Sequence, residues 1–286
     1  MYPAPFDYHR PASVEEAIQI LQSNPEAKII AGGHSLLPAM KLRLAAPSAL
    51  VDLHGIDELK GISVNGSATV GAMTTYDEIL SNQDLANTFG ALYQAVAEVG
   101  DIQVRNRGTL GGSASHADPA ADATAALVAH GAEFVVRGPN GERTISADEF
   151  FVDLFTTAME PEEVLVKINL PAPAENTSSA YAKFRHPASG YPVCGVAAVV
   201  TRDGSGTVTS ARVVATGSVL KPTRLTGVEE AITGTNGDAD AVAAAAERAE
   251  EGVSEWAGDH YASSEYRAHL TKVYAKRALN KALGNG

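Results

Sequence analysis

The stretch IIAGGHSLLPAMKLRLAAP runs from Ile29 to Pro47 and joins a short apolar segment to two glycines, a histidine and a serine. An apolar run that ends in Gly32 and Gly33 predicts a strand followed by a tight turn, because glycine adopts backbone conformations that other residues avoid. A helix is expected next, over residues 36–44, and Pro47 ends it. Such an element suits a hydrolase nucleophile at Ser35, a backbone cradle for a phosphate, or a plain turn without a ligand.

The residues around this stretch predict a small parallel α/β unit. Ser13 and Glu16 form an S-x-x-E capping box, which marks the start of a helix. The apolar positions of that helix recur at helical spacing and are Val14, Ala17, Ile18 and Leu21. Strands are expected around Phe6, over residues 28–31 and over residues 49–53. The order strand, helix, strand, turn, helix, strand is typical of parallel pairing.

The clearest change in composition is PAPAENTSS, residues 171–179, which we interpret as a linker. Before this linker, the sequence predicts a hairpin over 61–71 that turns at Asn65-Gly66. It also predicts helices over 74–80, 91–99 and 120–129, and strands over 132–136 and 163–170. The prediction after it is strands over 180–186, 193–202 and 207–216, then helices around 224–232, 239–251 and 261–283. We expect one domain over residues 1–175, with subdomains of about 1–55 and 56–175, and a second over residues 176–286.

Composition excludes several classes of function. The chain has 286 residues and a formal net charge of −12, and it has no basic stripe, so nucleic acid is not an expected partner. Cys194 is the only cysteine, which excludes an internal disulfide and an iron–sulfur cluster held by this chain alone. No apolar run is long enough to cross a membrane, and no apolar signal core begins the chain. A cytoplasmic protein is expected.

The hydrolase interpretation of Ser35 is not supported by the residues that follow it. A nucleophile elbow has the pattern G-x-S-x-G, and the last glycine is replaced here by Leu37. Pro38 comes next, and little chain precedes the site to build an oxyanion loop. A phosphate cradle explains the two glycines better, because close ligand approach needs residues without side chains.

A second glycine turn, RGTLGGS from Arg107 to Ser113, strengthens the phosphate interpretation. Two such loops can hold a diphosphate from two sides, with a helix expected to begin at Asp118-Pro119. The chain has no G-x-G-x-x-G after a strand and no P-loop, so neither common nucleotide fingerprint applies. His116, Asp118 and Asp122 have the spacing of metal ligands, but capping and a ligand hydrogen bond explain Asp118 better. We therefore expect no metal and no catalytic side chain.

Three segments together resemble a known family. AGGHSLLPAMKLRLAAP, RNRGTLGGSASHADPAAD and KFRHPASGYPVCGVAA are similar to the FAD-binding medium subunit of molybdenum hydroxylases. The AGGHS sequence is similar to the first loop of the branch that includes carbon monoxide dehydrogenase. Xanthine dehydrogenase has a related flavin domain with a different first loop. The resemblance implies an α+β fold, with an N-terminal FAD-binding portion of two α/β subdomains and a C-terminal α+β domain.

The resemblance also implies which residues meet FAD. The first segment contributes Lys28, Ile29, Ala31, Gly32, Gly33, His34, Ser35 and Leu36, with the first two near adenine and ribose. The second contributes Thr109, Gly111, Gly112, Ser113, Ser115, Asp118 and Asp122. Leu165 matches an apolar contact, and Tyr191 matches an aromatic residue close to the isoalloxazine. Lys183 and Arg185 both align near a basic position beside the flavin, and the choice between them is open.

The implied function is electron transfer by an FAD subunit of a molybdenum hydroxylase. The molybdenum cofactor and two [2Fe–2S] clusters are then expected on a large molybdenum subunit and a small iron–sulfur subunit, as a dimer of heterotrimers. Electrons would leave through FAD to an external acceptor. The alternatives are a stand-alone FAD oxidase with its own substrate site and a nucleotide-binding module without catalysis.

Overall fold

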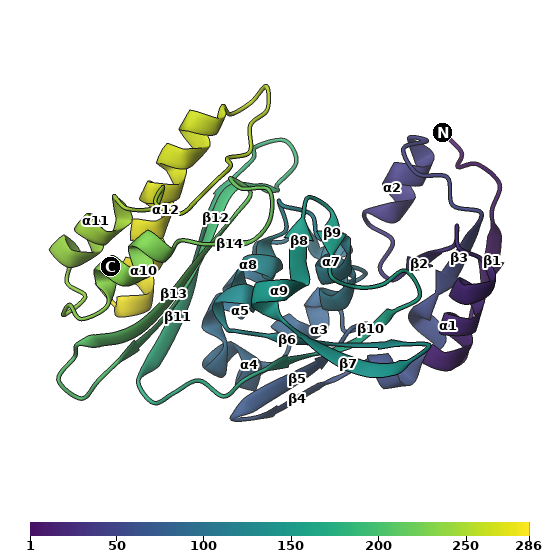
Figure 1. Ribbon diagram of the computed structural model, residues 1–286, viewed down its shortest axis with the longest axis horizontal. Coiled ribbons are helices and arrows are strands. Elements are labelled where there is room, and N and C mark those ends of the chain that lie inside the picture. Colours follow the sequence, from purple (N-terminus) through teal and green to yellow (C-terminus); the bar gives the residue numbers. More distant parts are fainter. Residues whose placement is uncertain (286) are drawn as a thin grey trace.

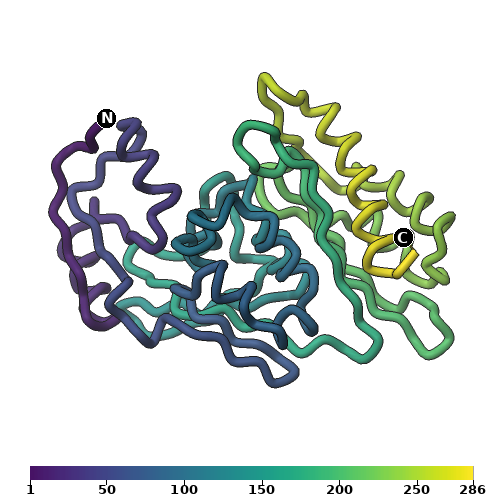
Figure 2. Tube along the Cα trace, turned by 180° about the vertical axis from the view of Figure 1, so that it is seen from behind, coloured from purple at the N-terminus to yellow at the C-terminus, as the bar shows by residue number. Residues whose placement is uncertain are grey.

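A computed structural model describes residues 1–285 as three units side by side (Figure 1). The N-terminal unit and the C-terminal unit lie on opposite sides of the middle unit in both views (Figure 2). Each unit has its own main sheet, of three, five and four strands in chain order, and a two-stranded hairpin is added to the middle unit. The α+β class expected from the family resemblance is confirmed. Within the described residues, no helix combines the length and the apolar character needed to cross a membrane.

The N-terminal unit is the predicted parallel α/β unit. Its strands are β1 (Asp7–His9), β2 (Lys28–Ile30) and β3 (Ala49–Asp52), paired in parallel in the order β1-β3-β2. Helix α1 (Val14–Ser23) begins at Ser13, whose hydroxyl accepts from the Glu16 N–H, and it buries all four predicted apolar positions. Helix α2 (Leu36–Lys41) is shorter than expected, because the chain turns back at Arg43, which has a φ of 60°. Two 3₁₀ turns follow the sheet, η1 (Leu53–Gly55) and η2 (Asp57–Leu59).

The middle unit is an antiparallel sheet with helices on one face. Its strands are β4 (Ile62–Asn65), β5 (Ser67–Gly71), β10 (Val164–Leu170), β6 (Glu133–Gly138) and β7 (Gly141–Ser146), in that spatial order. Its helices are α3 (Tyr76–Leu80), α4 (Gln83–Thr88), α5 (Gly90–Ala97), α6 (Ile102–Arg105), α7 (Leu110–His116), α8 (Asp122–Ala129) and α9 (Ala147–Phe150). The small hairpin is β8 (Phe151–Asp153) with β9 (Thr156–Thr157). The predicted turn at Asn65-Gly66 is confirmed, with Gly66 at a φ of 74°.

The prediction of a helix that begins at Asp118 is wrong. Helix α8 begins only at Asp122, with Ala121 as its N-cap, and the Asp118 carboxylate accepts from the Ala120 N–H in a preceding turn. A helix that the sequence did not predict, α7, begins at the second glycine turn. Its N-cap is Thr109, whose hydroxyl accepts from the Gly112 N–H at 3.0 Å. Two successive glycines disfavour a helix on propensity alone, so contacts with the rest of the fold must stabilise this one.

The C-terminal unit has a sheet that is buried on both faces. Its strands are β11 (Thr177–Arg185), β12 (Pro192–Arg202), β13 (Val208–Thr216) and β14 (Thr223–Arg224), followed by α10 (Thr226–Ile232), α11 (Ala239–Ala246) and α12 (Ser264–Leu283). Alternate strand residues point to opposite faces. One set, which includes Ala180, Val196 and Val213, packs in a core with α10, α11 and α12. The other set, Tyr181, Ala197 and Val214, belongs to the core of the middle unit.

Candidate functional site

The two glycine loops that the sequence singled out lie against each other. The first loop, residues 31–35, joins β2 to α2, and the second, residues 107–113, leads into α7. A Cβ atom added to Gly32 would lie 2.2 Å from the Arg107 carbonyl oxygen, and one added to Gly112 would lie 3.2 Å from the Ala31 Cβ. The contact at Gly32 is backbone to backbone, so no other residue fits there without moving a loop.

The first loop has backbone donors that the protein does not use. Gly33 has a φ of 77°. Within residues 1–285, the N–H groups of Gly33, His34 and Ser35 donate no hydrogen bond, while the Gly33 and Ser35 carbonyls accept from Leu37 and Ala39. Successive N–H groups around a residue with positive φ can bind an anion. This loop can therefore receive a phosphate through its backbone.

Most N–H groups of the second loop are already used within the protein. The Leu110 and Gly111 N–H groups donate to the Thr74 and Ala72 carbonyls, and those of Gly112 and Ser113 donate to Thr109. A Cβ added to Gly111 would lie 2.5 Å from the Ala72 Cβ, so this glycine brings α7 close to the segment after β5. What the second loop offers a ligand is therefore mainly side chains. These are the Ser113 hydroxyl and the Ser115 hydroxyl on the exposed side of α7.

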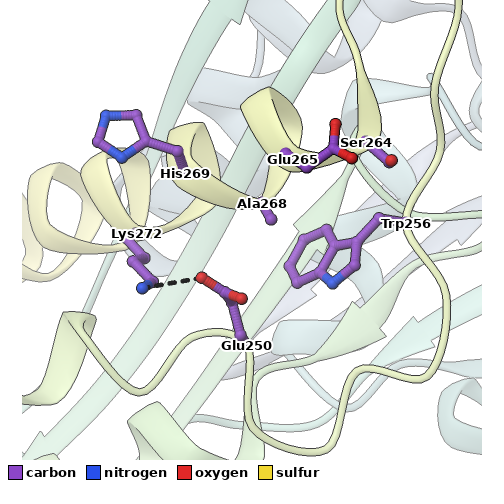
Figure 3. Close-up of a pocket in the computed structure, with 7 residues that line it drawn as sticks. All are labelled: Glu250, Trp256, Ser264, Glu265, Ala268, His269 and Lys272. Atoms are coloured by element: carbon purple, nitrogen blue, oxygen red, sulfur yellow. Dashed lines mark ion pairs between the residues drawn. The ribbon is translucent and has the colours of Figure 1, made fainter.

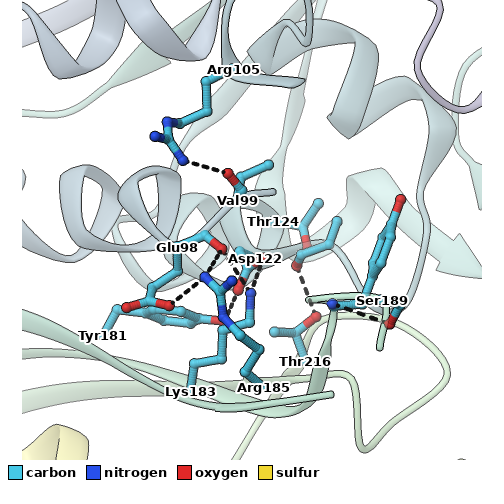
Figure 4. Close-up of polar contacts among 12 residues, drawn as sticks. Glu98, Val99, Arg105, Asp122, Thr124, Tyr181, Lys183, Arg185, Ser189 and Thr216 are labelled. Atoms are coloured by element: carbon cyan, nitrogen blue, oxygen red, sulfur yellow. Dashed lines mark hydrogen bonds and ion pairs between the residues drawn. The ribbon is translucent and has the colours of Figure 1, made fainter. Parts of the chain in front are cut away.

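Asp122 and Lys183 form a buried ion pair between the middle and C-terminal units (Figure 4). The Lys183 ammonium donates to Asp122 Oδ2 at 2.9 Å, and the Tyr181 hydroxyl donates to Asp122 Oδ1 at 2.7 Å. The two charged side chains are 2% and 5% exposed. Burial raises the pKa of Asp122 and lowers that of Lys183, and in each case the partner's charge opposes the shift. The charged groups of both side chains therefore bind partners within the interface between the units.

A second cation from the same strand lies closer to solvent. Arg185 donates to the Glu98 carbonyl oxygen at 3.0 Å, as Lys183 also does at 3.0 Å, and it pairs with the Glu98 carboxylate at 3.1 Å. Glu98 is the C-cap of α5, where the helix dipole favours positive charge. The Arg185 side chain is 46% exposed. Of the two basic residues, only Arg185 presents its charge at the edge of the interface.

Tyr191 of the C-terminal unit faces the first loop. Burial raises the pKa of Tyr191, the Asp118 charge raises it further, and interaction with the Ser35 side chain lowers it. Ser35, Asp118 and Tyr191 come from three different units in the sequence-based division, and they lie close enough for the first two to influence the pKa of the tyrosine. Tyr191 is nevertheless 45% exposed, so its ring is accessible there.

The other expected residues divide into two groups. Those beside the first loop are Lys28, Ile29, His34 and Leu36, of which Lys28 and His34 are exposed. Leu165 and Gly111 are buried in the core of the middle unit instead. His116, Asp118 and Asp122 do not converge, since the His116 ring lies against Phe155 and Asp122 faces Lys183. Among the described residues, no group of three His, Cys, Asp or Glu could hold a metal.

Sequence reasoning missed Tyr181 and Glu98. Tyr181 had a signal, because it alternates with Lys183 and Arg185 along one strand and therefore points to the same face. Glu98 had none, since its carbonyl meets these cations only through the packing of α5 on β11.

Burial raises the pKa of the Cys194 thiol to about 11, so this cysteine is protonated and unreactive.

One surface hollow lies away from these residues. It has a volume of about 280 Å³ and is lined by Glu250 and Trp256 with residues of α12 (Figure 3). A second hollow, of about 150 Å³, lies where the end of α8 and residues 171–174 meet the C-terminal sheet. Neither includes a residue of the glycine loops.

Comparison with known proteins matches both parts of the chain. The family described as the FAD binding domain in molybdopterin dehydrogenase matches residues 4–173, and the CO dehydrogenase flavoprotein C-terminal domain matches residues 179–282. The chain is 40% identical to the carbon monoxide dehydrogenase medium chain of Hydrogenophaga pseudoflava, over 99% of this chain and 98% of that one. The crystal structure of carbon monoxide dehydrogenase from that organism superposes with a TM-score of 0.94 at 39% identity, covering 99% of each chain. Quinoline 2-oxidoreductase from Pseudomonas putida 86 superposes at 0.92 with 34% identity, covering 100% of this chain and 99% of that one.

Proposed function

Because this chain belongs to the family of FAD-binding subunits of molybdopterin dehydrogenases, we propose that its first glycine loop and the hydroxyls of its second hold the FAD diphosphate. The chain is an oxidoreductase subunit, and the resemblance to the medium subunit of molybdenum hydroxylases is confirmed. FAD supplies the electron-carrying chemistry when bound, and the protein supplies its binding and orientation.

The main support for this proposal is the positive charge around the first loop. The chain as a whole is acidic, with 34 Asp and Glu residues against 22 Lys and Arg. Yet residues 27–51 contain no Asp or Glu, and their charged side chains are Lys28, Lys41 and Arg43. A diphosphate carries negative charge and is stabilised by such surroundings. The unused N–H groups at Gly33, His34 and Ser35 supply the matching hydrogen-bond donors.

The remaining residues have separate roles in this proposal. The hydroxyls of Ser113 and Ser115 approach the diphosphate from the side of α7. Tyr191, which faces Ser35, covers part of the isoalloxazine. Asp122 and Lys183 hold the C-terminal unit against the middle unit, and Arg185 places a positive charge at the edge of the same interface.

The chain works within a complex of several subunits. A [2Fe–2S] cluster needs at least two cysteine ligands even where histidines supply the others, and Cys194 is the chain's single cysteine. The clusters and the molybdenum cofactor therefore belong to a small iron–sulfur subunit and a large molybdenum subunit. A dimer of such heterotrimers is the proposed assembly. Electrons reach this chain from the iron–sulfur subunit and leave to an external acceptor.

The substrate is not selected by this subunit. Carbon monoxide dehydrogenase and quinoline 2-oxidoreductase act on unlike molecules, yet both contain a chain that superposes on this one over nearly its full length. We propose a carbon monoxide dehydrogenase-like complex on the strength of the 40% identity. We also propose the division at residues 1–55, 56–175 and 176–286, which the three sheets support, and a cytoplasmic location.

The test is to purify the protein from its native host, denature it and identify the released flavin. We expect one FAD per chain, with molybdenum, iron and two further subunits in the same fraction. FMN, or flavin that stays covalently attached, would contradict the diphosphate site. FAD without metals or partner subunits would favour the stand-alone oxidase, and a chain without flavin would favour a nucleotide-binding module.

A further inference from the structure

The loop that carries Tyr191 is closed by hydrogen bonds rather than by apolar packing. Residues 186–191, HPASGY, reverse the chain between β11 and β12. The His186 N–H donates to the Tyr191 carbonyl at 2.8 Å, and the Gly190 N–H donates to the His186 carbonyl at 2.9 Å. Gly190 has a φ of 75°, which the turn requires. Residues 187–189 are exposed, so burial does not fix their conformation.

The imidazole of His186 fills the inside of this turn. Its Nδ1 accepts from the N–H groups of Ala188 and Ser189, both at 3.2 Å. Since two N–H groups point at Nδ1, that nitrogen acts as the acceptor of the turn. The ring also packs on Tyr261, with the ring centroids 4.3 Å apart. The imidazole is therefore held from one side by the turn and from the other by the segment before α12.

Tyr191 has few constraints of its own. Its side chain is 45% exposed, and its N–H makes a long bond of 3.4 Å to the Ser189 hydroxyl. The backbone of the turn thus fixes the position from which the ring extends toward the Ser35 side chain. Without an acceptor at residue 186, the Ala188 and Ser189 N–H groups lose their partner and turn to water.

We propose that His186 is a positioning residue, which acts through Tyr191 on the flavin by fixing the turn that presents the tyrosine ring. This inference rests on the proposed function, because it requires Tyr191 to face the isoalloxazine. His186 itself does not touch the cofactor in this scheme. Its contribution is the acceptor Nδ1 and the ring that Tyr261 supports.

The test compares two substitutions of similar size in the intact complex. His186→Leu removes the acceptor, whereas His186→Asn can return an acceptor oxygen near the position of Nδ1. The measurements are FAD content, flavin fluorescence and the flavin midpoint potential. We expect all variants to keep FAD and His186→Leu to shift fluorescence and potential in the same direction as Tyr191→Ala. His186→Asn should return both part of the way toward the wild-type values, because it restores the acceptor but not the ring that packs on Tyr261. Tyr261→Ala serves as a second variant and should shift them in that same direction by removing the support of the ring.

The double variant His186→Leu/Tyr191→Ala tests whether His186 acts on the flavin through Tyr191. If His186 acts through Tyr191, the double variant behaves like Tyr191→Ala alone, because the effects of coupled residues do not add. Additive shifts in the double variant overturn the inference. So does a His186→Leu variant with unchanged potential and fluorescence, if Tyr191→Ala shifts both. Either result leaves the role of Tyr191 intact. Unchanged values in Tyr191→Ala itself overturn both, although FAD binding would still stand on the flavin content.

Discussion

The ammonium of Lys183 lies 2.9 Å from Oδ2 of Asp122, and this contact joins β11 of the C-terminal unit to α8 of the middle unit. The family resemblance implied that Asp122 meets the cofactor and that either Lys183 or Arg185 lies beside the flavin. In the structure they meet each other, with the Tyr181 hydroxyl as a third partner at 2.7 Å. A pair so deeply buried is costly to break, because removing one partner leaves an uncompensated charge away from water.

We therefore predict that Lys183→Met lowers the free energy of unfolding by about 3–5 kcal/mol. Replacing both partners, as Asp122→Asn with Lys183→Met, should cost less than the sum of the single changes. Urea denaturation followed by circular dichroism measures both effects. Arg185→Met is the matched control, because its half-exposed ion pair should contribute at most about 1 kcal/mol. Equal losses for Lys183→Met and Arg185→Met would show that the buried pair has no special importance.

Arg185 should affect the flavin and not the fold. A positive charge beside a flavin stabilises its reduced, more negative state, so we expect Arg185→Gln to lower the midpoint potential while the FAD content stays the same. Potentiometric titration of the holoenzyme checks this. Arg248→Gln, which removes an exposed charge paired with Glu251 on the far side of the C-terminal unit, is the control and should have no effect. A potential that is equal in both variants would exclude Arg185 from the surroundings of the flavin.

Gly32→Ala tests the contact between the two loops. The new methyl group would lie 2.2 Å from the Arg107 carbonyl oxygen, so one loop must move. We expect FAD affinity to fall by roughly tenfold or more, which corresponds to at least about 1.4 kcal/mol. Gly66→Ala provides the comparison, since its φ is 74° but nothing lies within 4 Å of the added carbon. Fluorescence titration of the apoprotein with FAD should show normal affinity for Gly66→Ala, and normal affinity for Gly32→Ala would refute the argument.

His130 predicts how stability depends on pH. Its side chain is buried against Phe89, its Nε2 has no hydrogen-bond partner among the described residues, and burial lowers its pKa to about 4. The folded protein therefore disfavours the charged ring that the unfolded chain acquires below its ordinary pKa of 6.5. Stability from this residue is complete above pH 6.5 and falls by up to about 1.4 kcal/mol per unit as the pH decreases toward 4.

The variant His130→Leu should flatten this part of the stability curve, and His260→Leu at an exposed position should leave it unchanged. Urea denaturation at several values between pH 6.5 and 4.5 gives the two slopes. The same slope in wild type and His130→Leu would mean that His130 is not charged on unfolding in this range.

Local signals in the sequence predicted the elements that depend on them. The capping box at Ser13, the helical spacing of the apolar residues that follow and the Asn65-Gly66 turn all describe interactions between near neighbours, and each is confirmed. Helix α7 was missed because its stability comes from elsewhere. Its Leu110 and Gly111 N–H groups donate to carbonyls of Thr74 and Ala72, which no pattern within residues 109–116 reveals.

The candidate site shows the same limit. The sequence identified both glycine turns, but Gly32 and Gly33 look alike in it. Only the fold distinguishes Gly32, which packs on Arg107, from Gly33, whose φ of 77° accompanies free N–H groups. Likewise, Lys183 and Arg185 are two positions apart on one strand, and their different exposure is determined by the ends of α5 and α8, which lie far away in the chain.

The sheet of the C-terminal unit, buried on both faces, has a consequence for how the chain can be divided. Tyr181, Ala197 and Val214 complete the core of the middle unit, so the boundary near residue 176 separates two sequence families without separating two folding units. A protease that cuts in residues 171–176 should yield two fragments that migrate together until a denaturant is added. For the same reason, a truncation, gene fusion or domain exchange that ends at this linker would expose an apolar face. The two parts of the chain must therefore be produced together.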